Sequence, residues 1–396
     1  MTGPQGLTAL PPLPPLRLTV PVGTRPEVIK LAPVVHALRA AGHLVRCIAT
    51  GQHYDARMYG DVFAGLGLVP DDVWALTGTE GERLGQLLSA AFAELSAHPA
   101  DAVLVLGDTY TAPLVAVAAR RYGAGVIHLE AGLRSQNGLS VEEVNRKMMV
   151  GLATVHLAPT GMAAAFLAGE GVPSSIVRVV GNPVVDAVVA MGIPVRPVSE
   201  RRGVLLTAHR ATNVDAPARL AELVALVKGL ASAHGPVLFP MHPRTRDRLV
   251  SAGWFDDLAA TGGVDIVEPL PYPSLLTALS TSAVTVTDSG GLQEEAAYFG
   301  VPAVVMRHST PRWEGVAAGT AVLTGMSADR VLQAVAQLTT AAELARIAAV
   351  PCPYGDGTTG AQVVAALEDV GLRRALAPAE PSYDPLQQLP LALSHG

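Results

Sequence analysis

Two series of short apolar strands, each alternating with segments of helical length, run along this chain. The first series reads RLTVPVG, VRCIATG, DAVLVLGD, GVIHLEAG and VHLAPT, and Ala- and Leu-rich segments such as 26–41 and 111–122 separate its members. A second series begins near residue 203 with GVLLTAHR, PVLFPMHP, VDIVEPL, AVTVTDSGG and PAVVMR. Repeated strand–helix units favour parallel sheets joined by right-handed crossovers. The sequence therefore predicts an α/β fold with two doubly wound, Rossmann-like domains that face a cleft.

The length of the chain supports two domains. A single hydrophobic core rarely extends beyond roughly 250–300 residues, and this chain has 396. We expect the first domain to include 17–187 and the second to be 188–356, with the Pro- and Arg-rich segment 187–202 as the hinge. The Pro-rich ends, 1–16 and 376–396, are predicted to be flexible tails.

Composition excludes several classes of protein. No run of about 18 apolar residues is present, which argues against a membrane span. The net charge is −6 without a basic block, which argues against a nucleic-acid partner. Cys47 and Cys352 are far apart and fit no metal spacing, and Cys47 in its apolar segment is typical of a reduced, structural thiol. The N-terminus lacks a basic start followed by an apolar core, so we expect a cytoplasmic protein.

A glycine turn follows the strand VTVT of the second series. Ser289, Gly290 and Gly291 lie between this strand and a helix that we expect to begin near Leu292. Glycines allow a ligand to approach the backbone, and free amides at a helix start attract phosphate. An ordinary turn with Ser289 as N-cap explains the same residues. Glu295 suits the helix dipole, but a carboxylate there can also bind the hydroxyls of a ribose.

A second glycine turn, GTRPEVIK, follows the first strand of the chain. It carries Arg25 and Lys30 around a Pro that starts a helix. Arg suits a diphosphate because its guanidinium binds two oxygens together. PMHPRTR adds His242 and Arg244 after another strand, although a surface turn explains these two equally well. Two facing glycine turns, one in each domain, indicate a bridged diphosphate.

Acidic residues and a histidine follow other strands. They are Asp108 in VLGDTYT, Glu130 in HLEAGLRS, Glu142 and Glu143 in VEEVNR, and His209 in TAHR. Asp108 could simply cap the helix at 111–122, and Glu142 with Arg146 could be a solvated pair on one helix. Glu130 is harder to explain without a function, because burying a lone carboxylate is costly. Several carboxylates in one cleft suit proton transfer.

The order of these motifs is similar to that in one known family. GTRPEVIK, GQH, LGDTYTA, HLEAGLRS, EEVNR, LAPT, VVGNPVVDA, TAHR, MHP, TDSGGLQEEA, VPAVVMR and PYGDG resemble blocks of the non-hydrolysing UDP-N-acetylglucosamine 2-epimerases. They occur in the family's order over about 18–370, which is far more specific than any one motif. The resemblance implies the two-domain glycosyltransferase-B architecture, usually as a homodimer. It also implies that 357–375, with a helix at 361–373, returns to the first domain.

The resemblance implies a reaction as well. UDP leaves C1 of the sugar while the C2 proton is removed, giving a 2-acetamidoglucal, and UDP adds back after a proton reaches the opposite face of C2. Leaving-group departure must assist, because C2 is not acidic by itself. No G-x-G-x-x-G fingerprint is present, so transient oxidation by NAD has no evident site. We therefore expect no cofactor, and no cluster has the spacing of a metal site.

Roles for individual residues follow from the matching motifs. Asp108, Glu130 and Glu142 would transfer protons, and His209 would assist near the diphosphate. The remaining matches would bind the UDP-sugar. Glu295 would bind the ribose hydroxyls, and Lys30 and Arg134 would lie near the sugar or phosphate. The diphosphate would be held by Arg25, His242, Ser289, Gly290 and Gly291. Backbone groups around Leu270 and Pro271 would read the uracil.

The chain departs from the family pattern at several positions. Val141 replaces the usual Pro before the Glu–Glu pair, and Thr212 replaces Glu in HRxEN. Many bacterial members bind a second, allosteric substrate molecule through a Gln-His-x-x-Gln-like stretch and a later Arg. Gln52 and His53 are retained, but Asp55 stands at the second Gln and no Arg near Gly81 clearly matches. Asp55 and the lack of a matching Arg count against allosteric activation.

Four alternatives share the same features. A hydrolysing epimerase would release free N-acetylmannosamine and UDP. An epimerase of another UDP-2-acetamido sugar would use the same chemistry. A glycosyltransferase would share the diphosphate site without needing three carboxylates at C2, and a non-catalytic sugar-nucleotide sensor would need no proton-transfer groups at all.

Overall fold

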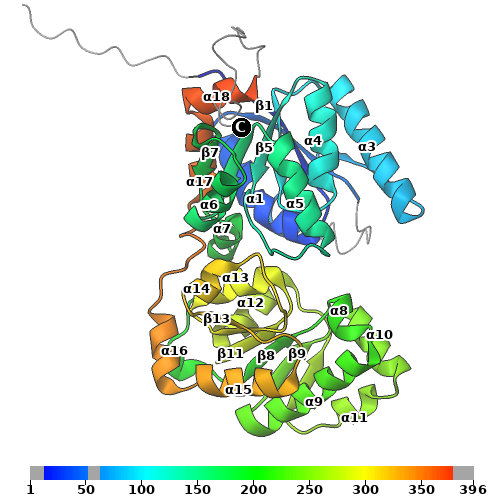
Figure 1. The fold of residues 1–396 in the computed structure, drawn as a ribbon, viewed down its shortest axis with the longest axis vertical. Helices are drawn as coiled ribbons and strands as arrows, with labels where there is room; N and C mark the ends of the chain where they lie inside the picture. The colour runs from blue at the N-terminus through cyan, green and yellow to red at the C-terminus, as the bar shows by residue number, and fades with distance from the viewer. Residues whose placement is uncertain (1–12, 52–62, 378–396) are drawn as a thin grey trace, which may run out of the picture.

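The computed structural model describes residues 13–51 and 63–377. Two lobes lie one above the other along the longest axis, and each is built around a sheet flanked by helices (Figure 1). All pairings within both sheets are parallel. The predicted fold class is therefore confirmed.

The first sheet has seven strands in the order β3-β2-β1-β4-β5-β6-β7. They are β1 (Arg17–Val22), β2 (Leu44–Ala49), β3 (Asp72–Val73), β4 (Ala102–Leu106), β5 (Gly125–Leu129), β6 (Val155–Ala158) and β7 (Val177–Val179). The helices that follow these strands are α1 (Arg25–Ala40), α3 (Glu80–Ala97), α4 (Thr111–Arg121), α5 (Val141–Leu152), α6 (Gly161–Gly169) and α7 (Pro183–Ala190). The strand order reverses between β1 and β4, which is the switch point where ligands bind in such sheets.

The second sheet has six strands in the order β10-β9-β8-β11-β12-β13. They are β8 (Val204–Thr207), β9 (Val237–Pro240), β10 (Val264–Val267), β11 (Val284–Thr287), β12 (Ala303–Val305) and β13 (Ala321–Leu323). Its helices are α8 (Ala211–Val214), α9 (Pro217–His234), α10 (Pro243–Ser251), α11 (Phe255–Ala259), α12 (Tyr272–Thr281), α13 (Gly290–Phe299), α14 (Trp313–Ala317), α15 (Ala328–Leu338) and α16 (Ala341–Ala348). Here the switch point lies between β8 and β11.

All ten strands that the apolar segments predict are present, whereas three others in the described part of the chain were missed. β3, β7 and β13 have only two or three residues and lie at the edges of the sheets. Their side chains are mostly exposed or half-buried, except Ala321. Segments of two or three residues are too short for the pattern of buried strands to indicate them.

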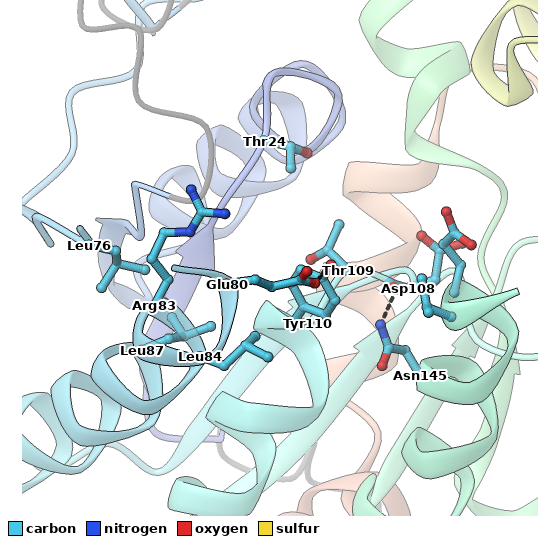
Figure 2. A pocket seen from close by; sticks show the side chains of 12 residues that line it. Thr24, Leu76, Glu80, Arg83, Leu84, Leu87, Asp108, Thr109, Tyr110 and Asn145 are labelled. Carbon is cyan, nitrogen blue, oxygen red and sulfur yellow. Dashed lines mark hydrogen bonds between the residues drawn. The ribbon is translucent and has the colours of Figure 1, made fainter. Parts of the chain in front are cut away.

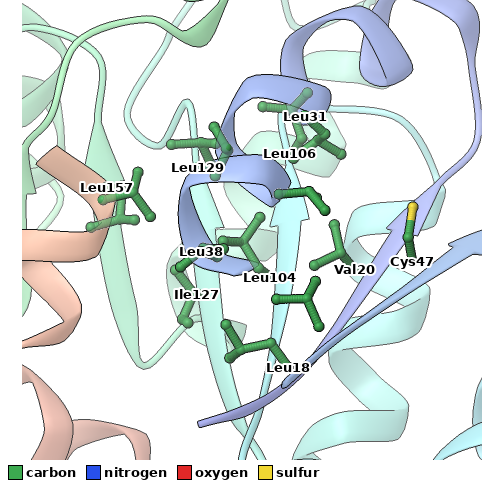
Figure 3. Close-up of a cluster of buried hydrophobic side chains, with 14 of the residues drawn as sticks. Leu18, Val20, Leu31, Leu38, Cys47, Leu104, Leu106, Ile127, Leu129 and Leu157 are labelled. Atoms are coloured by element: carbon green, nitrogen blue, oxygen red, sulfur yellow. The ribbon is translucent and has the colours of Figure 1, made fainter. Parts of the chain in front are cut away.

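The first hydrophobic core fills the space between the first sheet and α1. Figure 3 shows Leu18, Val20 and Leu104 of the strands packed against Leu31 and Leu38 of the helix. Cys47 lies in the same cluster as a free, fully buried thiol, and burial raises its pKa to about 12. The thiol is therefore a core residue, as its sequence context predicts.

Two residues assigned to the flexible tails belong to this core. Leu16 and Leu376 are both buried in the first cluster. The backbone amide of Leu16 donates to Nδ1 of His43 at 3.1 Å. The tail predictions at 16 and 376 are therefore wrong at their inner ends, because one apolar side chain beyond a Pro-rich stretch is enough to anchor the backbone. Residues 1–12 and 378–396 lie outside the described part of the chain.

The C-terminal segment returns to the first lobe as two helices. α17 (Thr359–Leu367) packs on α1, and α18 (Val370–Leu376) packs on β5 and β6. The single helix expected at 361–373 is interrupted because Asp369 has an extended backbone and caps α18, accepting from the amide of Leu372 at 2.9 Å. The domain boundaries and the hinge at 187–202 stay predictions. α7, which includes the first four residues of that segment, contacts both α1 and α13.

Candidate active site

The turns that follow β1, β4, β8 and β11 carry most of the predicted site residues. In a parallel sheet the carboxyl ends of all strands lie at one edge, so side chains far apart in sequence meet there. Gly23 follows β1 and Asp108 follows β4 in the first sheet, while His209 follows β8 and Ser289 follows β11 in the second. Both pairs of turns flank the switch point of their sheet. The fold thus gathers the two glycine turns and their neighbours.

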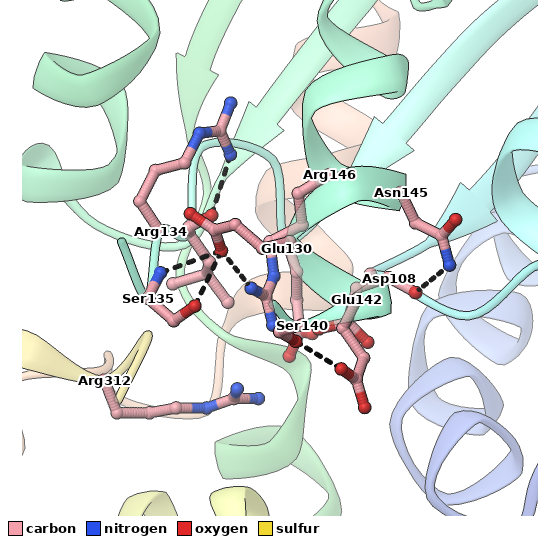
Figure 4. Close-up of polar contacts among 12 residues, drawn as sticks. Asp108, Glu130, Arg134, Ser135, Ser140, Glu142, Asn145, Arg146 and Arg312 are labelled. Carbon is pink, nitrogen blue, oxygen red and sulfur yellow. Dashed lines mark hydrogen bonds and ion pairs between the residues drawn. The ribbon is translucent and has the colours of Figure 1, made fainter. Parts of the chain in front are cut away.

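Asp108 is held as a carboxylate. It forms an ion pair with Arg146 of α5, and its backbone carbonyl accepts from Nδ2 of Asn145 at 2.8 Å (Figure 4). Burial raises the pKa of Asp108, but the charges of Arg146 and Arg312 outweigh it and hold the pKa below its usual range. The capping role that its sequence position allowed is not observed, since α4 begins at Thr111 with Tyr110 as N-cap.

Glu130 has an unusual backbone. Its φ of 60° lies in the left-handed region that non-glycine residues rarely adopt, and holding a side chain there costs about 1–2 kcal/mol. The carboxylate is buried and forms an ion pair with Lys30 of α1. Gly107 leaves room for it, because a Cβ at that position would lie 3.3 Å from Oε2 of Glu130. Strain of this kind concentrates at functional sites.

Lys30 joins the two lobes. Its Nζ contacts Glu130 and lies 3.2 Å from Oε2 of Glu294 on α13. Burial opposes the charge on Lys30, but the two carboxylates outweigh burial and raise its pKa. Glu130 is therefore not a lone buried carboxylate. Lys30, in the first lobe, forms an ion pair with Glu130 and a second ion pair with Glu294 of the second lobe.

Glu142 and Glu143 have different surroundings although they are adjacent on α5. Glu143 is buried, pairs with Arg146, and accepts from the backbone amides of Ser135 and Gln136 at 2.9 and 3.1 Å. Glu142 accepts from the hydroxyl of Ser140 (Figure 4). The solvated Glu142–Arg146 pair is thus not found, because Arg146 is buried and binds Asp108 and Glu143 instead.

A cavity of about 330 Å³ adjoins these carboxylates. Asp108 and Asn145 lie side by side in its lining (Figure 2), and Glu142 lines it as well. The other lining residues come from the first glycine turn, the α4 loop, α5, and α3 with its preceding segment: Thr24, Leu76, Glu80, Arg83, Leu84, Leu87, Thr109, Tyr110 and Val141. The proton-transfer candidates Asp108 and Glu142 thus share one solvent-accessible space. Gln52, His53 and Asp55 lie outside the described residues.

The first glycine turn is tied to the Asp108 loop by Glu27, which was not singled out from the sequence. Its Oε2 accepts from the amides of Gly23 and Thr24, both at 2.8 Å, and its Oε1 accepts from the hydroxyl of Thr109 at 2.7 Å. Burial raises the pKa of Glu27 to about 7. The S/T-x-x-E spacing of a capping box was visible in the sequence and could have identified this residue.

His209 and His242 lie together in the second lobe. Their rings are 5.7 Å apart, and Nδ1 of His209 lies 2.9 Å from Oδ1 of the fully buried Asp288. Asp288 also accepts from the amides of His209 and Arg210. His242 caps α10 by accepting from the amide of Arg244 at 3.1 Å, and burial with the nearby His209 lowers its pKa. Asp288 therefore fixes the orientation of the His209 ring.

The second glycine turn forms the start of α13. Ser289 is the N-cap and accepts from the amide of Leu292, so Gly290 and Gly291 are the first helical residues. The helix begins two residues before the expected Leu292. Ser289 does cap the helix, as the simpler explanation required, but capping leaves other amides of the first turn unpaired, and these are what an anion binds.

Positive charge gathers around this helix start. Arg307, just after β12, has no carboxylate partner within ion-pair distance in 13–51 or 63–377. Burial and the nearby cations Arg210, Arg312 and Arg146 lower the pKa of Arg307 to about 9. A Cβ at Gly290 would lie 3.2 Å from the guanidinium carbon of Arg312. Clustered guanidinium groups near a helix start suit the binding of a phosphate group.

The remaining candidates lie around α13 and α1. Glu295 is buried beside Tyr272, and burial raises the pKa of Glu295 to about 7. Arg25 is the first residue of α1, and its Nη2 lies 3.5 Å from the carbonyl of Leu270. That contact places Arg25 beside the backbone segment expected to read uracil.

Arg134 is not brought into the cluster. Its guanidinium is buried against Glu170 and the carbonyl of Leu133, and Figure 4 shows it pointing away from Asp108 and Glu142. Arg312 instead extends toward the cluster from the second lobe. The placement of Arg307 after a strand could have identified it, whereas Arg312 lies in a loop without such a signal.

Comparisons with known proteins agree on one family. Residues 36–368 match the family model described as UDP-N-acetylglucosamine 2-epimerase. A UDP-N-acetylglucosamine 2-epimerase of Methanocaldococcus jannaschii is 33% identical over 365 residues, covering 88% of this chain and 98% of the relative. A UDP-2,3-diacetamido-2,3-dideoxy-D-glucuronate 2-epimerase of Pseudomonas aeruginosa is 32% identical over 328 residues, covering 80% and 91%.

Solved structures give the same result. The Methanocaldococcus jannaschii epimerase in complex with UDP-GlcNAc and UDP matches with a TM-score of 0.78 and 33% identity, over 89% of this chain and 99% of that chain. A UDP-N-acetylglucosamine 2-epimerase, described as putative, from Listeria monocytogenes matches with a TM-score of 0.81 and 29% identity, over 90% and 96%. The comparisons of sequence and of fold therefore agree that this chain belongs to the UDP-N-acetylglucosamine 2-epimerase family.

Proposed function

We propose that the protein interconverts UDP-N-acetylglucosamine and UDP-N-acetylmannosamine by reversible inversion at C2. One observation carries the proposal: Lys30 contacts Glu130 of one lobe and Glu294 of the other, on the helix whose first turn is Ser289–Gly291. Proton-transfer carboxylates and a phosphate-binding turn thereby adjoin one another. The structure of a 33% identical relative in complex with UDP-GlcNAc and UDP supports this choice of substrate.

UDP would bind mainly to the second lobe. The amides of Gly290 and Gly291 would receive the diphosphate, with His242, Arg25 and Arg307 supplying further donors. Glu295 would bind the ribose hydroxyls, and Leu270 lies where the uracil would be read. These residues suit the task because a helix start and an unpaired guanidinium both stabilise phosphate charge.

The reaction needs two proton transfers on opposite faces of one carbon. In the first step the C2–H bond breaks, its electron pair forms the C1–C2 double bond, and the C1–O electron pair leaves with UDP. In the second step a proton reaches the other face of C2 and the UDP oxygen rebuilds the bond to C1. UDP is conserved over the cycle, so the step needs no oxidant and no cofactor.

The carboxylates suit these transfers. Asp108 is held ionised by Arg146, Glu130 is held by Lys30, and Glu142 lines the same cavity as Asp108. His209, oriented by Asp288, would stabilise the charge that develops on the departing diphosphate. In the described residues, no group of three or more His, Cys, Asp or Glu side chains could hold a metal ion.

The test is solvent exchange. Incubating the protein with UDP-N-acetylglucosamine in deuterated water should place deuterium at C2 and give a mixture of two UDP-sugars, followed by proton NMR. Free N-acetylmannosamine in step with UDP would instead show a hydrolysing epimerase. An unchanged spectrum would exclude epimerisation of this substrate and leave an epimerase of another UDP-2-acetamido sugar, a glycosyltransferase or a sensor.

A second substrate has specific support. The Pseudomonas aeruginosa relative bears the name of an epimerase for a diacetamido glucuronate, and it is 32% identical. The cavity beside Asp108 also contains Arg83, a cation that could face a sugar carboxylate. Repeating the exchange experiment with that UDP-sugar separates the two, because the true substrate gives the higher kcat/KM.

We also propose a homodimer. Leu139, Val141, Val144 and Met148 are exposed on α5 and the loop before it, and the last two lie one turn apart on the helix. An exposed apolar stripe of this kind marks an interface. Light scattering should give twice the chain mass of 40.9 kDa, and the paired change Val144→Glu with Met148→Glu should halve it. A monomeric parent protein would contradict the proposal.

No helix in the described residues is long and apolar enough to cross a membrane, and the cytoplasmic location stays a prediction.

A further inference from the structure

Glu294 occupies the junction between the lobes. Its side chain is fully buried, and three donors from three different segments surround it. Oε1 accepts from Nδ2 of Asn182 at 2.8 Å and from Nε of Arg312 at 2.9 Å, while Oε2 receives Nζ of Lys30 at 3.2 Å. Asn182 is the N-cap of α7 and Arg312 that of α14. Glu294 is therefore fixed in place from both lobes.

The charges around Glu294 balance. Lys30 and Arg312 are positive, and Glu130 and Glu294 are negative, with all four side chains largely buried. In such surroundings removing one member leaves an uncompensated charge, which is costly. Of the two carboxylates on Lys30, Glu294 has two other donors, whereas no other described residue donates to the carboxylate of Glu130. The position of Glu130 therefore depends on Lys30, and the position of Lys30 depends on Glu294.

α13 connects this arrangement to the nucleotide site. Its first turn is Gly290–Gly291, and Glu294 lies one turn further along the same helix. A displacement of the helix start would therefore move Glu294 with it. The backbone of Glu130 is strained, and a strained residue keeps its conformation only where the surrounding structure holds it. The direction of its carboxylate therefore depends on Lys30.

We propose that Glu294 is a positioning residue that sets Lys30 against Glu130 and so links the proton-transfer carboxylate in one lobe to the diphosphate-binding helix in the other. This inference rests on the proposed role of Glu130 in C2 proton transfer. It assigns no contact between Glu294 and substrate. Its effect must therefore pass through Lys30.

The variant Glu294→Gln tests the link, because the amide keeps the size of the side chain and removes its charge. We expect kcat to fall by about 10- to 100-fold, since displacing a catalytic group by about 1 Å has an effect of that order, while the Kd for UDP changes by less than about twofold. The alkaline limb of the kcat–pH profile should move to lower pH, because Lys30 loses one of the two carboxylates that raise its pKa against burial. A purely structural role would lower kcat equally at every pH.

Two further variants make the result specific. Glu294→Asp keeps the charge and should leave the alkaline limb in place even if kcat falls. Asn182→Ser can retain the cap on α7, which Asn182 provides by accepting from the amide of Val184, but it loses the donor to Glu294. Asn182→Ser should therefore lower kcat in the same direction by a smaller factor, and it serves as the test if Glu294→Gln does not fold. An unchanged kcat and pH profile in both Glu294→Gln and Asn182→Ser would overturn the inference, as would parallel losses of kcat and UDP affinity.

Lysine NMR makes the inference independent of turnover. The chain has only three lysines, Lys30, Lys147 and Lys228, so a protein labelled with [ε-13C]lysine gives a spectrum that Lys147→Arg and Lys228→Arg assign. The Lys30 signal should titrate at lower pH in Glu294→Gln than in the parent protein, and added UDP should shift it in the parent more than in the variant. If the parent shows no C2 exchange, the proposed function fails while these two readouts still decide the positioning role. Identical titrations in parent and variant would overturn it.

Discussion

Replacing Glu130 with Gln is expected to lower kcat by about 100-fold or more, because proton transfer by a positioned side chain contributes roughly 10²–10⁴-fold. Gln retains the size of the side chain and an oxygen that can accept from Lys30, and Lys30 keeps its ion pair with Glu294. UDP affinity should change by less than about twofold, since the turn proposed to bind the diphosphate lies in the other lobe. Steady-state rates and a calorimetric titration with UDP measure the two quantities separately.

The reciprocal variant is Arg307→Ala. Arg307 is a cation without a carboxylate ion pair in the described residues, close to Arg312 and Asp288, and charge-assisted hydrogen bonds contribute about 1.5–3 kcal/mol. UDP should therefore bind about 10- to 100-fold more weakly. Arg330→Ala removes an exposed Arg on α15 and should leave both kcat and UDP affinity unchanged.

For the first variant, equal losses of turnover and UDP affinity in Glu130→Gln would give Glu130 a structural role instead.

The largest expected effect on stability comes from Gly132→Ala. Gly132 has a φ of 86°, and a Cβ there would lie 2.1 Å from the carbonyl oxygen of Ala163. The left-handed conformation costs an L-residue about 1–2 kcal/mol, and forcing an atom into packed structure adds typically about 1–3 kcal/mol. Because the contact is with backbone on α6, the helix itself must move. We expect Tm to fall by about 10 °C or more.

Gly171→Ala is the matched control for this change. Gly171 has nearly the same φ, 84°, but nothing lies within 4 Å of a Cβ built there. It should therefore show the conformational cost alone, a Tm decrease of a few degrees. Similar decreases in both variants would mean that the helix shifts freely. Since Gly132 follows Glu130 by two residues, the first variant should also lose kcat, whereas Gly171→Ala should keep it.

The sequence predicted more about the turns at the strand ends than about the ion pairs that connect the two lobes. Gly23, Asp108, His209 and Ser289 were identified because each follows a strand, and strand ends of a parallel sheet meet at one edge. Arg134 satisfied a motif, yet its guanidinium turns to Glu170. The direction of a side chain depends on partners that only folding brings close, such as Glu170. A motif within one segment does not indicate those partners.

The roles of Glu142 and Glu143 show the same limit. Both begin α5 and both were equally placed to reach Arg146. In the structure Glu143 takes the buried position against Ser135, and Glu142 is left in the cavity wall. The choice depends on the loop before the helix, which supplies backbone amides to one carboxylate and not to the other.

By itself, the order of strands and helices determined two parallel sheets, and the residues at the strand ends indicated where carboxylates would gather and where we propose that a diphosphate binds. These follow from local pattern, because strand period, glycine turns and helix starts are properties of neighbouring residues. The tertiary structure alone decided that Lys30 joins Glu130 to Glu294 across more than 160 positions of sequence, that Arg312 and Asn182 fix Glu294, and that Arg307 has no carboxylate partner among the described residues. Charges buried at an interface select partners by distance and desolvation, and both exist only after the two lobes have met.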